Sequence, residues 1–197
     1  MQSNSNIFPQ NSNLIIGYCY GSGYQKYLPI FVNSIIASFN DVDILILCTQ
    51  TIQSKIKGKI SILNNCQNII IKENYFPLIN YNYDDIKQYI SKSQFYRFLR
   101  FIIPEEMMNG YTNAYIGDID ICYFKQLNEK GTSLFERENR IANNNNLSFN
   151  NILRTNEQGE ITLRLGGLHF IKVRQYLNDY GEIINKIRND KYSLIEL

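Results

Sequence analysis

Three short apolar runs, separated by two segments with helical spacing, constrain the fold of this chain more than any other feature. The runs are 14–20 (LIIGYCY), 42–48 (VDILILC) and 68–71 (NIII), and each reads as a buried strand. Between them, apolar residues recur with helical spacing over 28–39, and more weakly over 52–60 with Thr51 as the expected N-cap. This β-α-β-α-β order predicts an α/β domain with a mainly parallel central sheet and flanking helices.

The second half of the chain continues the pattern less regularly. A helix is expected to begin at Ser91 or Ser93 and to stop before Pro104, because the residue before proline avoids helical geometry. An apolar strand over 111–124 (YTNAYIGDIDICYF) follows it. The run 143–146 consists of asparagine alone and is expected to be a mobile loop. A strand over 161–173, interrupted by Gly166-Gly167, leads into a last helix over 173–187.

The length and composition of the chain fit one domain and exclude several classes of protein. A chain of 197 residues suits one domain over 14–197, after a leader over 1–13 that is expected to be disordered. No window reaches the ~18 apolar residues of an integral membrane segment. A net charge of +2, with lysine and arginine scattered, gives no argument for nucleic acid. The four cysteines lack C-x-x-C spacing, which favours buried thiols and a cytoplasmic location.

The chemistry of the chain is expected to centre on two carboxylates, Asp118 and Asp120, within the strand over 111–124. In an extended chain, side chains two residues apart lie on the same face, about 6.5 Å apart. A carboxylate within an apolar run must be paired, hydrogen-bonded or metal-bound, because an isolated buried charge is too costly. Oxygen ligands with this spacing suit a hard divalent cation. The alternative is a strand end at which both side chains are simply solvated.

The position of this pair in the expected sheet suggests what it binds. Doubly wound sheets bind ligands at the carboxyl ends of their strands, which here are Gly21-Ser22-Gly23, the segment after Cys48, and the D-x-D. The first turn does not complete a dinucleotide fingerprint. With that fingerprint excluded, we expect a nucleotide beside the first strand. Its diphosphate would be bridged to a metal bound by the two aspartates. Arg97 or Arg100 could contribute charge to the phosphates, and the alternative is a solvated helix face.

Several stretches, in the same order, resemble GT-A-fold nucleotide-sugar glycosyltransferases, most of all the retaining group of lipopolysaccharide galactosyl- and glucosyltransferases and glycogenin. The stretches are GYCY, YQKYLPIFVNSI, SQFYRFLRFIIP, YIGDIDICYF and RLGGLHFIKV, and together they extend from residue 14 to residue 188. The resemblance implies a hexosyltransferase that retains the configuration of the sugar. It also implies a role in polysaccharide biosynthesis, with a glycan or glycolipid acceptor and a location at the inner face of the membrane.

The resemblance also implies roles for individual residues. Asp118 and Asp120 would bind Mn²⁺ or Mg²⁺, with Asp118 also near the ribose of a UDP-sugar donor. Arg97 would contact the donor. The remaining implied contacts are Tyr18 and Tyr20 beside the base, and Gly166 and Gly167 beside the sugar.

Two departures from the family pattern lead to alternative functions. The family's third metal ligand is a histidine near the C-terminus, whereas His169, the only histidine here, lies in the Gly-Gly strand and reads as buried and hydrogen-bonded. The asparagine usual before the sugar-contacting glycine is replaced around Leu165-Gly166. A truncated or non-catalytic nucleotide-sugar-binding domain is therefore one alternative, and a metal-dependent phosphodiesterase is another.

Overall fold

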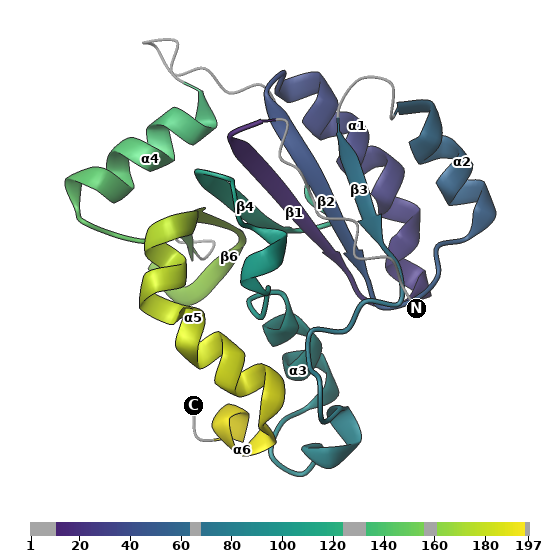
Figure 1. Ribbon diagram of the computed structural model, residues 1–197. Coiled ribbons are helices and arrows are strands. Elements are labelled where there is room, and N and C mark those ends of the chain that lie inside the picture. The colour runs from purple at the N-terminus through teal and green to yellow at the C-terminus, as the bar shows by residue number, and fades with distance from the viewer. Residues whose placement is uncertain (1–10, 64–67, 124–132, 156–160, 196–197) are drawn as a thin grey trace.

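The computed structural model describes residues 11–63, 68–123, 133–155 and 161–195, and only the backbone at 152–155, 161–168 and 195. The fold is an α/β sandwich around one six-stranded sheet with the strand order β3-β2-β1-β4-β6-β5 (Figure 1). The strands are β1 (Asn13–Cys19), β2 (Val42–Cys48), β3 (Ile69–Lys72), β4 (Asn113–Asp118), β5 (Phe149–Thr155) and β6 (Ile161–Lys172).

The first four strands in this order are parallel to one another. The last two pairings, β4 with β6 and β6 with β5, are antiparallel. β1 pairs in parallel with β2 on one side and with β4 on the other, and β2 pairs in parallel with β3. β6 runs antiparallel to both β4 and β5. The predicted α/β class with a mainly parallel sheet is therefore confirmed, whereas β5 was not expected from the sequence.

Helices cover both faces of the sheet (Figure 1). The α-helices are α1 (Leu28–Ser38), α2 (Ser54–Leu63), α3 (Lys92–Leu99), α4 (Leu134–Asn144), α5 (Val173–Asn189) and α6 (Lys191–Ile195). The short 3₁₀ helices are η1 (Ser22–Tyr27), η2 (Tyr83–Asp85) and η3 (Glu105–Met107). No helix in the described part of the chain is long and apolar enough to cross a membrane.

The two faces of β1 are buried in separate hydrophobic cores, because successive side chains of a strand alternate between the faces. Leu14, Ile16 and Tyr18 pack into one core with residues of α3, α5 and α6. Ile15 and Cys19 pack into the other with residues of α1, α2 and α4. Every residue of β1 is buried, as expected for a central strand of a parallel sheet.

Four local expectations differ from the structure. The strand expected over 111–124 ends at Asp118, where a hydrogen bond from Ile121 N to Asp118 O (3.2 Å) closes a turn. β6 continues through Gly166-Gly167 without interruption. The asparagine run is not a loop throughout, because its first two residues end α4, Asn145 is the C-cap and Asn146 follows in a turn with φ of 52°. Helix α2 begins at Ser54, since the Thr51 hydroxyl bonds the Asn74 side chain and caps no helix. Residues 1–10 of the expected leader lie outside the described residues.

Helix α1 packs against the sheet at Gly17, where only glycine leaves enough room. A Cβ atom at Gly17 would lie 2.7 and 2.9 Å from two ring carbons of Phe31, and 3.1 Å from Cγ2 of Ile119. Phe31 is fully buried and also contacts the ring of Tyr123 edge-on, so it has little freedom to move. Gly17 therefore sets the approach of α1 to β1.

We expect Gly17→Ala to lower the free energy of unfolding by about 1–3 kcal/mol, because the added methyl group overpacks a filled core. Urea denaturation measures this change. The control is Gly58→Ala in α2, where a Cβ meets nothing within 4 Å. That substitution removes helix-interior glycine and should raise stability by about 0.5–1 kcal/mol. Equal effects at both positions would contradict the close approach at Gly17.

Candidate functional site

The sequence-predicted site residues gather where the sheet changes its order. β1 lies between β2 and β4, and the chain leaves the carboxyl end of β1 toward β2 but that of β4 toward β5 and β6, on the opposite side. Open α/β sheets bind ligands in the crevice at such a point. The register pairs Tyr18 of β1 with Asp118 of β4 at this end. Both residues therefore occupy the topological switch point, which is the usual ligand position in open α/β sheets.

Asp118 ends β4 and Asp120 follows it in a turn, so the two aspartates do not lie in one extended strand. Asp118 is the last residue of β4, and its side chain is 33% exposed. Ile119 is buried beneath the turn, while Asp120 is exposed. The two carboxylates thus stand at the solvent boundary of the crevice, with an aliphatic anchor between them.

Arg100, and not Arg97, forms an ion pair with Asp118. Ser91 caps the start of α3 through a capping box with Gln94, and Arg100 follows the last residue of this helix. The Arg100 guanidinium forms an ion pair with Asp118, and its side chain is only 13% exposed. Its Nε also donates to the Arg97 carbonyl oxygen (2.9 Å), while the Arg97 side chain is exposed. A donor contact by Arg97 remains a prediction, and Arg100 is the arginine beside Asp118.

A group of tyrosines forms the wall next to this ion pair. Tyr20, which follows β1, stacks on Tyr96 of α3 with ring centroids 3.5 Å apart and planes at 21°. Burial, followed by the nearby Tyr75, Tyr96 and Tyr20, raises the pKa of Tyr18, which therefore stays protonated. The Tyr18 hydroxyl is buried and has no hydrogen-bond partner among the described residues. Such a group costs about 1–3 kcal/mol of stability, which a polar ligand could recover.

β6 completes the site on the other side of β4. Its last observed pair with β4 joins Leu168 to Gly117, one residue before Asp118. Because the strands are antiparallel, Gly166 and Gly167 come next along β6 toward the carboxyl end of β4. The position of their backbone is consistent with the expected role beside a ligand at Asp118.

His169 lies behind the site as a buried neutral group. It is 2% exposed, it hydrogen-bonds the Asn151 side chain, and it contacts the rings of Phe101 and Phe149. Burial, and then the charge of Arg100, lower the pKa of His169 from 6.5 to about 4. This agrees with the expectation of a buried, hydrogen-bonded histidine and leaves the aspartates as the expected metal ligands.

The residues present suit a metal that arrives with a phosphorylated ligand. Among the described residues, no group of three or more His, Cys, Asp or Glu side chains could enclose a metal ion. Two carboxylates at the end of β4 fit Mg²⁺ or Mn²⁺ only if water or phosphate oxygens complete the shell, as these hard cations often allow.

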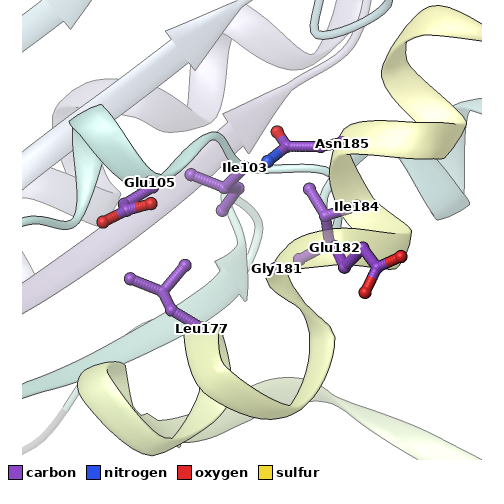
Figure 2. A pocket seen from close by; sticks show the side chains of 7 residues that line it. All are labelled: Ile103, Glu105, Leu177, Gly181, Glu182, Ile184 and Asn185. Carbon is purple, nitrogen blue, oxygen red and sulfur yellow. The ribbon is translucent and has the colours of Figure 1, made fainter.

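A pocket of about 200 Å³ lies away from these residues, against α5 (Figure 2). It is lined by Ile103, Glu105, Leu177, Gly181, Glu182, Ile184 and Asn185. Glu105 belongs to η3, which precedes β4 in the chain. The pocket shares no residue with the site at the carboxyl end of β4 and is not part of it.

Comparison with solved structures identifies the architecture. The mannosyltransferase Ktr4p of S. cerevisiae superposes with a TM-score of 0.55 at 12% identity, covering 91% of this chain. The core-mannan synthase CmsA of Aspergillus fumigatus, in its Mn/GDP form, gives a TM-score of 0.52 at 8% identity. The fold is that of the GT-A glycosyltransferases. No protein-family model and no curated protein matches the sequence.

The similarity covers nearly all of this chain but only part of each known structure. The match to Ktr4p covers 91% of this chain and 60% of Ktr4p. The match to CmsA covers 91% of this chain and 64% of CmsA. It spans 38% of the glycosyltransferase GlyE of Streptococcus pneumoniae TIGR4, at 13% identity, 89% coverage of this chain and a TM-score of 0.50. The GT-A architecture is therefore shared, and the lipopolysaccharide and glycogenin group is not distinguished within it.

The single histidine makes the electrostatics of the site measurable. We expect the His169 imidazole to titrate by NMR near pH 4 in the folded protein, because burial and Arg100 both oppose its charge. In Arg100→Met its pKa should rise, since one opposing charge is gone. Titration near 6.5 in the folded wild-type protein would contradict the buried environment.

The same shift predicts how stability depends on pH. Below pH 6.5 the unfolded chain takes up a proton at His169 that the native protein does not, so stability falls until about pH 4. A difference between 6.5 and about 4 corresponds to a loss of about 3 kcal/mol. Urea midpoints measured for wild type and His169→Gln across this range should therefore converge as the pH falls.

Proposed function

We propose that this chain is the donor-binding domain of a glycosyltransferase that moves a hexosyl group from a nucleotide diphosphate sugar to a glycan or glycolipid acceptor. The observation that carries the proposal is the Arg100–Asp118 ion pair at the switch point of a GT-A fold. It places one cationic and one anionic group where such a sheet binds a nucleotide diphosphate. The retaining outcome and a cytoplasmic location at the inner face of the membrane are further parts of this proposal.

Each part of the donor has a proposed contact. Asp118 and Asp120 would hold Mn²⁺ or Mg²⁺ together with the diphosphate. The stacked Tyr20 and the unpartnered Tyr18 hydroxyl are proposed to face the base and ribose. Gly166 and Gly167 of β6 are proposed to contact the sugar, where the absence of side chains would let it approach the backbone.

The proposed reaction places charge where the chain can compensate it. Breaking the bond between the sugar and the diphosphate develops negative charge on the leaving phosphate, and the sugar becomes oxocarbenium-like. A divalent cation held by the aspartates would stabilise the leaving group as a Lewis acid. Arg100 would release part of its contact with Asp118 and donate to the phosphate, and its restricted exposure would keep that contact strong.

The identity of the nucleotide, UDP or GDP, is a question for a direct binding experiment. The sequence resemblance implies UDP, whereas the similar Ktr4p structure was solved in complex with GDP and the CmsA structure in a Mn/GDP form. Both nucleotides therefore belong in the first experiment. A non-catalytic nucleotide-sugar-binding domain would give the same binding without turnover. A phosphodiesterase needs further acidic or histidine ligands, and the described residues do not provide such a group.

We expect UDP or GDP to bind in calorimetric titration with Mn²⁺ present, and to bind at least about tenfold more weakly without it or in Asp120→Ala. Asp120 is exposed, so this substitution should leave the fold intact, which circular dichroism checks. Acceptor-dependent transfer of labelled sugar would then separate a transferase from a binding domain. Equal binding with and without metal would contradict the proposed use of the aspartates.

The two arginines give a second, sharper test. Arg100→Met should weaken nucleotide diphosphate binding by about tenfold or more, because a charge-assisted hydrogen bond is worth about 1.5–3 kcal/mol. Arg97→Met should have the smaller effect, since Arg100 forms an ion pair with Asp118 and the Arg97 side chain is exposed. Binding of the nucleoside monophosphate and diphosphate by each variant would show whether the lost contact is to phosphate. A larger loss in Arg97→Met would return the role to the arginine predicted from the sequence.

A further inference from the structure

Two buried cysteines lie side by side at the carboxyl ends of neighbouring strands. Cys19 ends β1 and Cys48 ends β2, and the parallel register makes their Cα atoms direct partners. Both thiols are free, both are 1% exposed, and both belong to the core beneath α1 and α2. Adjacent strands are about 4.7–4.9 Å apart. That separation falls within the Cα–Cα range of about 4.4–6.8 Å found in disulfides.

The two thiols already interact with each other and with the turn that follows β1. A hydrogen bond to Cys19, then burial, raises the pKa of the Cys48 thiol. The Cys19 thiol in turn donates to the Gly21 carbonyl oxygen, with a sulfur–oxygen distance of 3.9 Å. Gly21 has φ of 73° and its backbone N–H donates to Thr49 Oγ1 (3.2 Å). The pair is therefore linked to the segments that follow β1 and β2.

We propose that Cys19 and Cys48 form a reversible disulfide on exposure to a disulfide oxidant such as oxidised glutathione. In the first step one thiolate attacks the oxidant, forms a mixed disulfide and releases one thiolate of glutathione. The second thiolate then attacks the protein sulfur of the mixed disulfide and displaces the other glutathione. The protein loses two protons and two electrons, and one molecule of oxidised glutathione becomes two thiols.

The disulfide would change the turn at Gly21. Oxidation removes the Cys19 S–H, so the hydrogen bond to the Gly21 carbonyl is lost. It also joins the two sulfur atoms by a bond of about 2.05 Å, which fixes the ends of β1 and β2 relative to each other. Because Gly21 follows β1 at the switch point and bonds Thr49, the oxidation state would be coupled to the shape of the proposed site.

Burial makes the exchange slow. The raised pKa of Cys48 keeps its thiolate fraction low, and the thiolate is the reacting species. The oxidant must therefore reach the pair during transient opening of the strand ends. Cys122 is an exposed free cysteine. It provides an internal standard, because its thiol can react without any opening of the fold.

The test is peptide mapping of the folded wild-type protein after incubation with oxidised glutathione. Remaining thiols are alkylated, and the protein is digested without reduction and analysed by mass spectrometry. We expect a linked peptide pair joining Cys19 and Cys48 that forms more slowly than the glutathione adduct of Cys122 and disappears on reduction. Cys48→Ser should abolish the linked pair and leave the Cys122 adduct unchanged.

Three results would overturn the proposal. The first is that Cys19 and Cys48 stay free while Cys122 is fully modified. The second is that each carries glutathione without a link between them. The third is that the link forms only in urea, because the native register would then play no part. Circular dichroism of each variant confirms folding, and the wild-type map decides the matter if a variant fails to fold.

The effect of the disulfide on the nucleotide site is measured separately, as nucleotide affinity. This part of the proposal rests on the proposed function. The oxidised protein should bind nucleotide diphosphate with Mn²⁺ several-fold more weakly than the reduced protein. A linked pair with unchanged nucleotide affinity would overturn this coupling. Failure of both redox forms to bind any nucleotide would instead overturn the proposed function, while the linked peptide would still establish the disulfide.

Discussion

The parallel pairing of β1 with both β2 and β4 is the interaction on which the rest of the structure depends. It buries β1 on both faces and aligns the carboxyl ends of three strands, bringing Tyr18 opposite Asp118 and Cys19 opposite Cys48. A shift of one residue in this register would move every side chain of β1 to the other face. The closeness of Phe31 to Gly17 opposes such a shift, since only glycine fits beneath that ring.

The charges at this edge are balanced within the chain. Arg100 offsets Asp118, and its charge together with burial keeps His169 neutral. Replacing this arginine therefore affects an ion pair and a histidine pKa at once. The unpartnered Tyr18 hydroxyl is the opposite case, because its buried polar group lacks a partner among the described residues. A site with a compensated carboxylate and an unsatisfied donor is suited to exchanging internal contacts for contacts with a polar ligand.

Sequence reasoning succeeded where one physical signal dominated. Buried parallel strands show as continuous apolar runs, so β1 and β2 were predicted with nearly correct bounds. It failed where two signals competed. The apolar run around Asp118 continues past the end of β4, because Ile119 is buried by a turn and not by a strand. The asparagine run hid the end of α4, although the capping box of Ser133 and Glu136 marks where that helix begins.

The sequence by itself determined the α/β class, the nearly complete burial of the first two strands and the presence of two carboxylates after an apolar strand. These follow from local periodicity and composition, which do not depend on distant residues. Only the tertiary structure decided which arginine meets Asp118. Arg97 and Arg100 are one turn apart in the sequence, and the folded chain places Arg100, at the C-cap of α3, in an ion pair with Asp118, while the Arg97 side chain is exposed. Strand register likewise decided that two of the four cysteines face each other, because pairing between strands is a non-local property.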